Sequence, residues 1–128
     1  MVDIATSIFS FFVLITLIVV VHEGGHFSAA KICGVKVLAF SIGFGKKLFS
    51  LKRGETVFSF SAIPLGGYVQ MLEVNDRSEM DNIEDCFETK SLFARSFIIA
   101  AGPIANFILA FCVYWIIFVK GVAGPIPY

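Results

Sequence analysis

Two histidines and a glutamate, His22, Glu23 and His26, follow an apolar run and have the spacing of a zinc-binding helix. On an α-helix each residue turns by about 100°, so side chains four apart lie one above the other on one face. His22 and His26 could therefore bring two imidazoles to one zinc ion. Glu23 lies on the flank of that face, where its carboxylate could take a proton from a zinc-activated water and later pass it to a leaving amine.

A chance match is the alternative, because a lone histidine on an apolar face is more often a core residue than a ligand. Here three polar residues occur in the right order at the end of a membrane-length run, where ionisable side chains are costly and usually functional. The two residues between them, Gly24 and Gly25, have two interpretations. They either loosen the end of the helix or leave room for a substrate backbone or a neighbouring strand near the metal.

The rest of the chain has the composition of a membrane protein. Of its 128 residues 57% are hydrophobic, and its 10 basic and 10 acidic residues cancel. This neutral balance gives no argument for nucleic-acid binding. Three widely spaced cysteines, Cys33, Cys86 and Cys112, lack any metal-ligand spacing, so we expect free thiols and no disulfide framework.

Two segments exceed the roughly 20 apolar residues that a bilayer core requires, residues 4–32 and residues 96–119. Asp3 stands where a signal peptide would have a basic residue, so the first segment is expected to be retained. The fold class predicted is a mainly α membrane protein, with two transmembrane helices joined by a cytoplasmic loop. Gly102 and Pro103 should either kink the second helix or mark where it starts.

The distribution of charge predicts the orientation. Basic residues are concentrated between the two spans: Lys31, Lys36, Lys46, Lys47, Lys52, Arg53, Arg77, Lys90 and Arg95. The positive-inside rule then places the connecting segment in the cytoplasm and both termini on the opposite, periplasmic side. Lys31 is only five residues beyond His26, so the histidines should lie a turn or two inside the membrane from its cytoplasmic face.

The connecting segment divides into two parts. Residues 35–71 are glycine-rich, aromatic and β-like, with a hairpin expected at about residues 47–63 and a turn at residues 52–55. This part is unusually apolar for a loop, so we expect a membrane-re-entrant hairpin that lies against the histidine face; a self-packed cytosolic hairpin is the alternative. Residues 73–90 carry most of the acidic side chains and are expected to be a solvated, mobile linker without a catalytic role.

Four segments together resemble the site-2 protease-type intramembrane zinc metalloproteases, of the bacterial RseP class. They are His22-Glu23-Gly24-Gly25-His26-Phe27, Gly43-Phe44-Gly45, Pro64-Leu65-Gly66-Gly67-Tyr68-Val69-Gln70-Met71 and Ala101-Gly102-Pro103-Ile104-Ala105-Asn106-Phe107. The resemblance covers the chain as the N-terminal part of such an enzyme. It implies a bacterial inner-membrane protein that cleaves transmembrane segments of substrates such as anti-sigma factors or leftover signal peptides. His22 and His26 would then bind Zn²⁺, and Glu23 would be the general base.

The resemblance also assigns residues that contact substrate. The region from Gly43 and Gly45 to Gly66 and Gly67 would align an unwound substrate by strand addition, and Asn106 would hold substrate or a reaction oxyanion. From the residues alone, Asn106 should face protein or a cavity, where an interhelical hydrogen bond is an equally good role. The glycine pair at 66 and 67 is also compatible with a tight turn that uses positive φ.

One departure from the family is large. A catalytic zinc site keeps three protein ligands, but the family's Leu-Asp-Gly motif, which supplies the third, does not occur in this sequence, and neither does a PDZ-like domain. Residues 121–128 look like the start of a periplasmic domain. We therefore expect a truncated product, a split protein or a fragment that is inactive alone. The alternative is a non-catalytic membrane interaction protein that binds partner or substrate helices.

Overall fold

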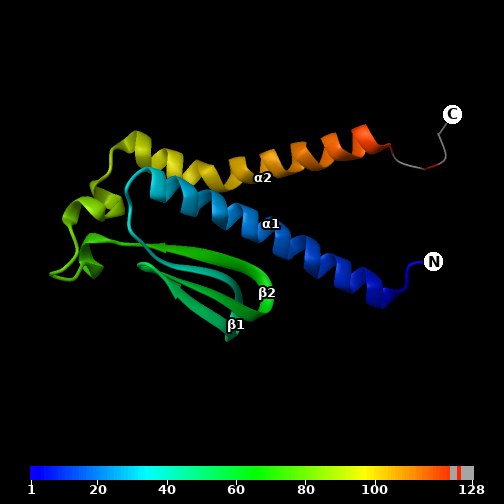
Figure 1. Ribbon diagram of the computed structural model, residues 1–128, viewed down its shortest axis with the longest axis horizontal. Coiled ribbons are helices and arrows are strands. Elements are labelled where there is room, and N and C mark those ends of the chain that lie inside the picture. The colour runs from blue at the N-terminus through cyan, green and yellow to red at the C-terminus, as the bar shows by residue number, and fades with distance from the viewer. Residues whose placement is uncertain (122–123, 125–128) are drawn as a thin grey trace.

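The structure, a computed structural model, describes residues 1–121 and Gly124. Two helices, α1 (Ile4–Ile32) and α2 (Leu92–Lys120), are each long and apolar enough to cross a membrane. α1 lies between α2 on one side and a β-hairpin on the other (Figure 1). The two predicted spans are confirmed as helices, although the second begins at Leu92 rather than at Ser96. The segment expected to lead into a further domain falls mostly outside the described residues.

Side chains that cap their N-termini fix where both helices start. The Asp3 carboxylate accepts a hydrogen bond from the Thr6 amide at 2.7 Å, and the Ser91 hydroxyl accepts one from the Ala94 amide at 3.1 Å. Because Ser91 supplies the cap, α2 is already established when it reaches Pro103, which lies inside the helix. The prediction that Pro103 marks the start of the second span is therefore wrong, while a kink there stays a prediction.

The hairpin is formed by β1 (Val37–Arg53) and β2 (Thr56–Met71), which pair antiparallel around a turn at Gly54 and Glu55. The hairpin and its turn are confirmed, but its strands extend well beyond the expected residues 47–63. Both strands bend, so residues 39–42 of β1 have partners at 57–60 and again at 67–70 of β2. The sheet is thus four segments wide, and residues 67–70 form one of its edges.

Glycines permit these bends. Gly43 and Gly45 in β1 have φ of 84° and 83°, and Gly66 in β2 has φ of 99°, values that only glycine adopts readily. A Cβ at Gly43 would lie 2.7 Å from the Ile63 carbonyl oxygen. The positive φ expected in the Gly66–Gly67 pair is therefore found at Gly66, but in a bent strand rather than in a tight turn.

The two helices approach each other where their side chains are smallest. A Cβ at Gly25 would lie only 2.4 Å from the Ala101 carbonyl oxygen and 2.9 Å from the Ala105 methyl carbon. Ala29 and Ala30 are buried beside this crossing, with Ile98 of α2. Small residues allow such close approach of membrane helices. Gly25 therefore packs against α2, and the expectation that it leaves room for a substrate or strand is wrong.

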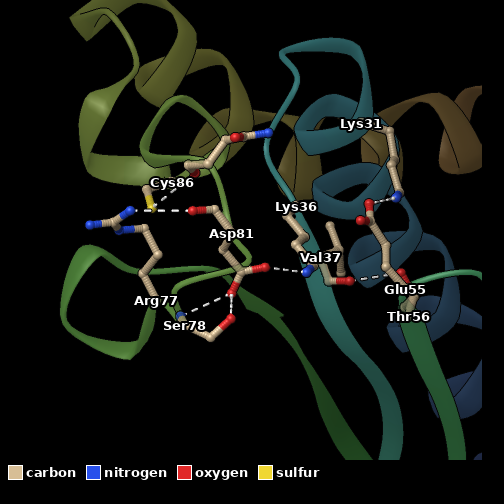
Figure 2. Close-up of polar contacts among 10 residues, drawn as sticks. Lys31, Lys36, Val37, Glu55, Thr56, Arg77, Ser78, Asp81 and Cys86 are labelled. Carbon is tan, nitrogen blue, oxygen red and sulfur yellow. Dashed lines mark hydrogen bonds and ion pairs between the residues drawn. The ribbon is translucent and has the colours of Figure 1, made fainter.

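The acidic segment between β2 and α2 is more ordered than its composition predicts. It contains three 3₁₀ helices, Val74–Asp76, Ile83–Asp85 and Phe87–Thr89. Most of its residues are exposed, as expected for a solvated linker. Backbone and side-chain bonds nevertheless attach it to the start of the hairpin. The Lys36 side chain donates to the Asp81 carboxylate (Figure 2), and the Lys36 amide donates to the Asp85 carbonyl oxygen. Cys86, which lies within this segment, is fully buried.

All three cysteines are free thiols in the structure, as expected.

Candidate metal centre

The imidazoles of His22 and His26 converge on the face of α1 that meets α2. Their Nε2 atoms are 3.2 Å apart, and the ring centroids are 4.8 Å apart with the planes at 80°. The four-residue spacing brings the rings to one helical face, and the contact with α2 holds them there. Both side chains are half-buried. The structure thus brings together the two residues that the sequence singled out as metal ligands.

Each imidazole has a partner on α2 at its other nitrogen. The Nδ1 atom of His26 lies 2.8 Å from the Ile98 carbonyl oxygen, which can only accept, so His26 carries its proton on Nδ1 and its lone pair on Nε2. The Nδ1 atom of His22 lies 3.1 Å from the Asn106 side-chain nitrogen. Hydrogen bonds from the second ring nitrogen to a carbonyl oxygen, as at His26, are the ones that orient metal-binding histidines. The sequence could not provide them, because they depend on the register between the two helices.

The backbone of Gly102 lies against the same two nitrogens. A Cβ at this position would be 2.3 Å from Nε2 of His26 and 2.9 Å from Nε2 of His22. No side chain fits there without displacing the rings. The absence of a side chain at Gly102 therefore leaves the space next to the two Nε2 atoms unfilled. We predicted Gly102 only as a helix-breaking residue, and its place at this site is new information from the structure.

These residues fit a zinc ion. Two nitrogens bound tetrahedrally at about 2.0–2.1 Å are roughly 3.3 Å apart, close to the separation of the two Nε2 atoms. One of the buried polar atoms without a hydrogen-bond partner, Oδ1 of Asn106, lies beside this pair. Within residues 1–121 and Gly124, however, no group of three His, Cys, Asp or Glu side chains is placed to hold a metal ion. The described residues therefore offer two side chains that fit zinc, where a catalytic zinc site needs three protein ligands.

A cavity of about 430 Å³ opens beside His26 between α1, β2 and the start of α2. Glu23 and His26 line it together with Gly67, Tyr68 and Val69 of β2. A Cβ at Gly67 would lie 3.1 Å from a Val19 methyl carbon and 3.4 Å from Cγ of Glu23, so β2 packs directly on the histidine-bearing part of α1. The hairpin therefore approaches the Glu23 side of the histidine-bearing segment, whereas the histidine face itself meets α2, and the depth of the hairpin in a membrane stays a prediction.

The structure separates the other predicted site residues. Gly67 lines the cavity, whereas Gly43, Gly45 and Gly66 lie at the strand bends. Glu73 also lines the cavity, although the sequence placed it in a linker without a role at the site. Its position directly after the strand that carries Gly67 is the signal that could have located it.

The chain matches known proteins over nearly its whole length. The model of peptidase family M50 matches residues 10–125. The chain is 48% identical over 123 residues to the regulator of sigma E protease of Haemophilus influenzae, and 46% identical over 121 residues to the regulator of sigma-E protease RseP of Escherichia coli. It is 49% identical over 124 residues to a Pasteurella multocida protein that carries zinc metalloprotease in its name.

These alignments cover 92–94% of this chain but only 27–28% of each relative. The chain therefore spans little more than a quarter of the length of the curated relatives that it matches. The resemblance to the RseP class is confirmed, and the chain belongs to peptidase family M50.

Proposed function

We propose that this chain forms part of an intramembrane zinc metalloendopeptidase that cleaves transmembrane segments of membrane proteins. The observation that carries the proposal is the pair of Nε2 atoms, 3.2 Å apart, beside a cavity that Glu23 lines. Membership in peptidase family M50 supports a protease, and the name of the Pasteurella multocida relative supports zinc. The third metal ligand would come from a segment outside these 128 residues.

The residues of the site divide the chemistry among them. His22 and His26 would hold the zinc, which when bound supplies the Lewis acidity that activates a water and polarises the scissile carbonyl. Glu23 accepts the proton of the attacking water and passes it to the amine that leaves, as a general base and then a general acid. The contact with α2 fixes both imidazoles before substrate arrives, so little reorganisation is required during the reaction.

The edge of the hairpin provides a place for the substrate backbone. Residues 67–70 pair with 39–42 on one side only, and Gly67, Tyr68 and Val69 face the cavity of Glu23. An extended segment that adds to this edge would pass beside Glu23 and His26. A transmembrane helix must unwind to do so, which suits substrates of the anti-sigma factor or signal-peptide type. Gly43, Gly45 and Gly66 would contribute by shaping the bent strands.

We place the protein in the bacterial inner membrane, with both termini periplasmic and the connecting segment cytoplasmic. The concentration of basic residues between the helices supports this orientation. Large apolar side chains on the far part of the hairpin are exposed, which supports a re-entrant position in contact with lipid: Phe44, Leu48, Phe49, Leu51, Ile63 and Leu65.

Reconstitution with the missing part tests the proposal. The chain is co-expressed with the C-terminal segment of a related regulator of sigma E protease, and cleavage of a model transmembrane substrate is followed. We expect cleavage by the wild type and none by Glu23→Gln or His22→Ala, with all three proteins folded as judged by thermal unfolding. Unimpaired cleavage by Glu23→Gln would refute the assigned base.

A second function follows from the incomplete ligand set. With two imidazoles and no third ligand among the described residues, the chain by itself could act as a non-catalytic partner that binds substrate or partner helices. It would then bind zinc below one equivalent and show no cleavage in the reconstitution, while retaining the substrate in a pull-down from membranes.

A further inference from the structure

The cavity beside His26 contains a second carboxylate, Glu73, that the proposed chemistry does not use. Glu73 lines the cavity and is exposed, whereas Glu23 is half-buried, so Glu73 lies at the open rim. Among the residues that the structure describes, the Glu73 carboxylate makes no hydrogen bond and no ion pair. A carboxylate at the rim of a substrate cavity, with no partner of its own, is available to a cationic group of the substrate.

Glu73 lies on the same face of the hairpin edge as the residues beside Glu23. Side chains alternate between the two faces of a strand. Four residues at alternate positions line the cavity: Gly67, Val69, Met71 and Glu73. The strand geometry continues past the end of β2, because the Leu72 amide donates to the Lys36 carbonyl oxygen at 2.9 Å and Glu73 is extended, with φ of −107° and ψ of 155°. The edge of β2 therefore leads without a break from Glu23 to Glu73.

This edge defines a distance between the general base and the rim. A Cβ at Gly67 would lie 3.4 Å from Cγ of Glu23, so Gly67 is level with the base. Glu73 follows six residues later, and at about 3.3 Å per residue it lies up to about 20 Å further along the strand. The acidic segment lies at the same end of the molecule as the end of α1 and the start of α2 (Figure 1). In the proposed orientation this is the cytoplasmic end.

We propose that Glu73 is a specificity-determining residue that pairs with a lysine or arginine of the substrate, about six residues from the scissile bond on its cytoplasmic side. A substrate strand on the edge of β2, with its scissile bond beside Glu23, places that residue opposite Glu73. Because six is an even number, both side chains lie on the cavity face. The ion pair then determines which bond lies beside Glu23. The proposal rests on the proposed function and names the substrates that this site selects.

The composition of the cavity suits a long basic side chain. No lysine or arginine is among the described residues that line it, and its other walls are largely apolar: Val69, Met71, Phe87, Ile98 and Ile99. Methylene groups of lysine and arginine pack on such walls while the charged end reaches a carboxylate. Glu88 adds negative charge beside Glu73, because its carboxylate accepts a hydrogen bond from the Val74 amide at 2.8 Å. Lysine and arginine are also the residues concentrated at the cytoplasmic ends of transmembrane segments.

Photo-crosslinking of the chain in lipid nanodiscs tests this register. The photoreactive residue p-benzoylphenylalanine is introduced at Tyr68, which lines the cavity. The probe is a synthetic transmembrane peptide of leucine and alanine, with glycines at its centre and a single lysine near one end. Mass spectrometry identifies the peptide residue that is crosslinked. We expect that moving the lysine by two positions along the peptide moves the crosslinked residue by two positions in the same direction.

Variants of Glu73 separate its charge from its shape. Glu73→Gln should lower the crosslinking yield at limiting peptide by up to about fivefold, and the crosslinked residue should no longer follow the lysine. Glu73→Lys should instead favour a peptide that carries glutamate in place of the lysine, a reversal that a merely structural role would not produce. Glu79→Gln is the matched control, because Glu79 is exposed in the same acidic segment and does not line the cavity.

The outcomes distinguish this proposal from the proposed function. A crosslink that ignores the position of the lysine, or follows it equally in Glu73→Gln, would overturn the role of Glu73 and leave the peptidase function standing. An equal loss in Glu79→Gln would overturn it too, since attraction would then come from the whole acidic segment. Absence of any crosslink from position 68 would overturn substrate alignment along this edge and the proposal with it. A crosslink that follows the lysine, without cleavage in the reconstitution, would support recognition by Glu73 and count against the peptidase function.

Discussion

The two halves of the helix pair differ in what surrounds them. Around the crossing, Gly25 touches the Ala101 carbonyl oxygen and Ile98 is only 1% exposed. Toward the termini the helices diverge (Figure 1), and none of the most apolar 18-residue window of α1 is buried. Large side chains of α2 are exposed there: Phe107, Phe111, Tyr114, Trp115, Phe118 and Val119.

This difference shows that hydropathy locates membrane helices, whereas side-chain size decides where they touch. Lipid is as apolar as leucine or phenylalanine, so large apolar residues gain little by packing on another helix in a bilayer. Glycine and alanine gain close backbone contact, and at this crossing the contact also positions two imidazoles. The polar site therefore lies where the small residues are.

Two neighbouring isoleucines offer the strongest test of this contrast. Ile98 is 1% exposed in the crossing, and Ile99 is 62% exposed. We expect Ile98→Ala to lower the free energy of unfolding by about 2–5 kcal/mol, because it leaves a cavity in the core. Ile99→Ala should change it by less than about 1 kcal/mol. Thermal unfolding in nanodiscs measures both, and equal losses would show that the crossing is not the core of this chain.

The adjacent glycines of α1 form a second matched pair. A Cβ at Gly25 would overlap the Ala101 carbonyl oxygen, whereas a Cβ at Gly24 would meet nothing within 4 Å. Gly25→Ala should therefore destabilise the chain by about 1–3 kcal/mol, since backbone must move. Gly24→Ala should leave the stability unchanged or raise it by up to about 1 kcal/mol, because alanine favours the helix. If Gly25→Ala does not lower the stability, the two helices can move apart at the crossing without cost.

The sequence located the elements and the converging histidine pair because both depend on local spacing. The apolar runs gave the helices, and the four-residue spacing placed His22 and His26 on one face. What it missed depends on how separate elements meet. The role of Gly25 against Ala101, the place of Gly102 at the imidazoles and the presence of Glu73 in the cavity all follow from the packing of α1, α2 and β2. Bends at Gly43 and Gly66 likewise make a wider sheet than a simple hairpin pattern predicts.

Gly102 connects the crossing to metal binding. Because a Cβ there would lie 2.3 Å and 2.9 Å from the two Nε2 atoms, Gly102→Ala should displace the imidazoles. We expect at least tenfold weaker zinc binding, or about 1.4 kcal/mol, with the helical circular dichroism unchanged. Zinc titration in nanodiscs measures the effect, with Gly24→Ala as the control for an added methyl group. Unchanged zinc affinity in Gly102→Ala would show that the metal does not bind at this edge of the rings.

The smallest effect is expected where the acidic segment joins the hairpin (Figure 2). A hydrogen bond from Lys36, with further bonds from the Ser78 amide and hydroxyl, lowers the pKa of the Asp81 carboxyl to about 2. This value lies below the pKa of about 3.9 for an unfolded chain. The carboxylate therefore stabilises the fold above about pH 4, and this contribution is lost as the pH falls toward 2.

Asp81→Asn should remove that part of the pH dependence and leave the helix crossing and zinc binding unchanged. Thermal unfolding between about pH 2 and pH 6 would show a flatter profile for the variant than for the wild type. Glu79→Gln is the matched control, because the Glu79 carboxylate makes no hydrogen bond in the part of the chain that the structure describes. If both variants keep the slope of the wild type, the contact between Lys36 and Asp81 does not hold the acidic segment against the hairpin. If Asp81→Asn alone loses it, the ionised Asp81 carboxylate stabilises the fold through this contact.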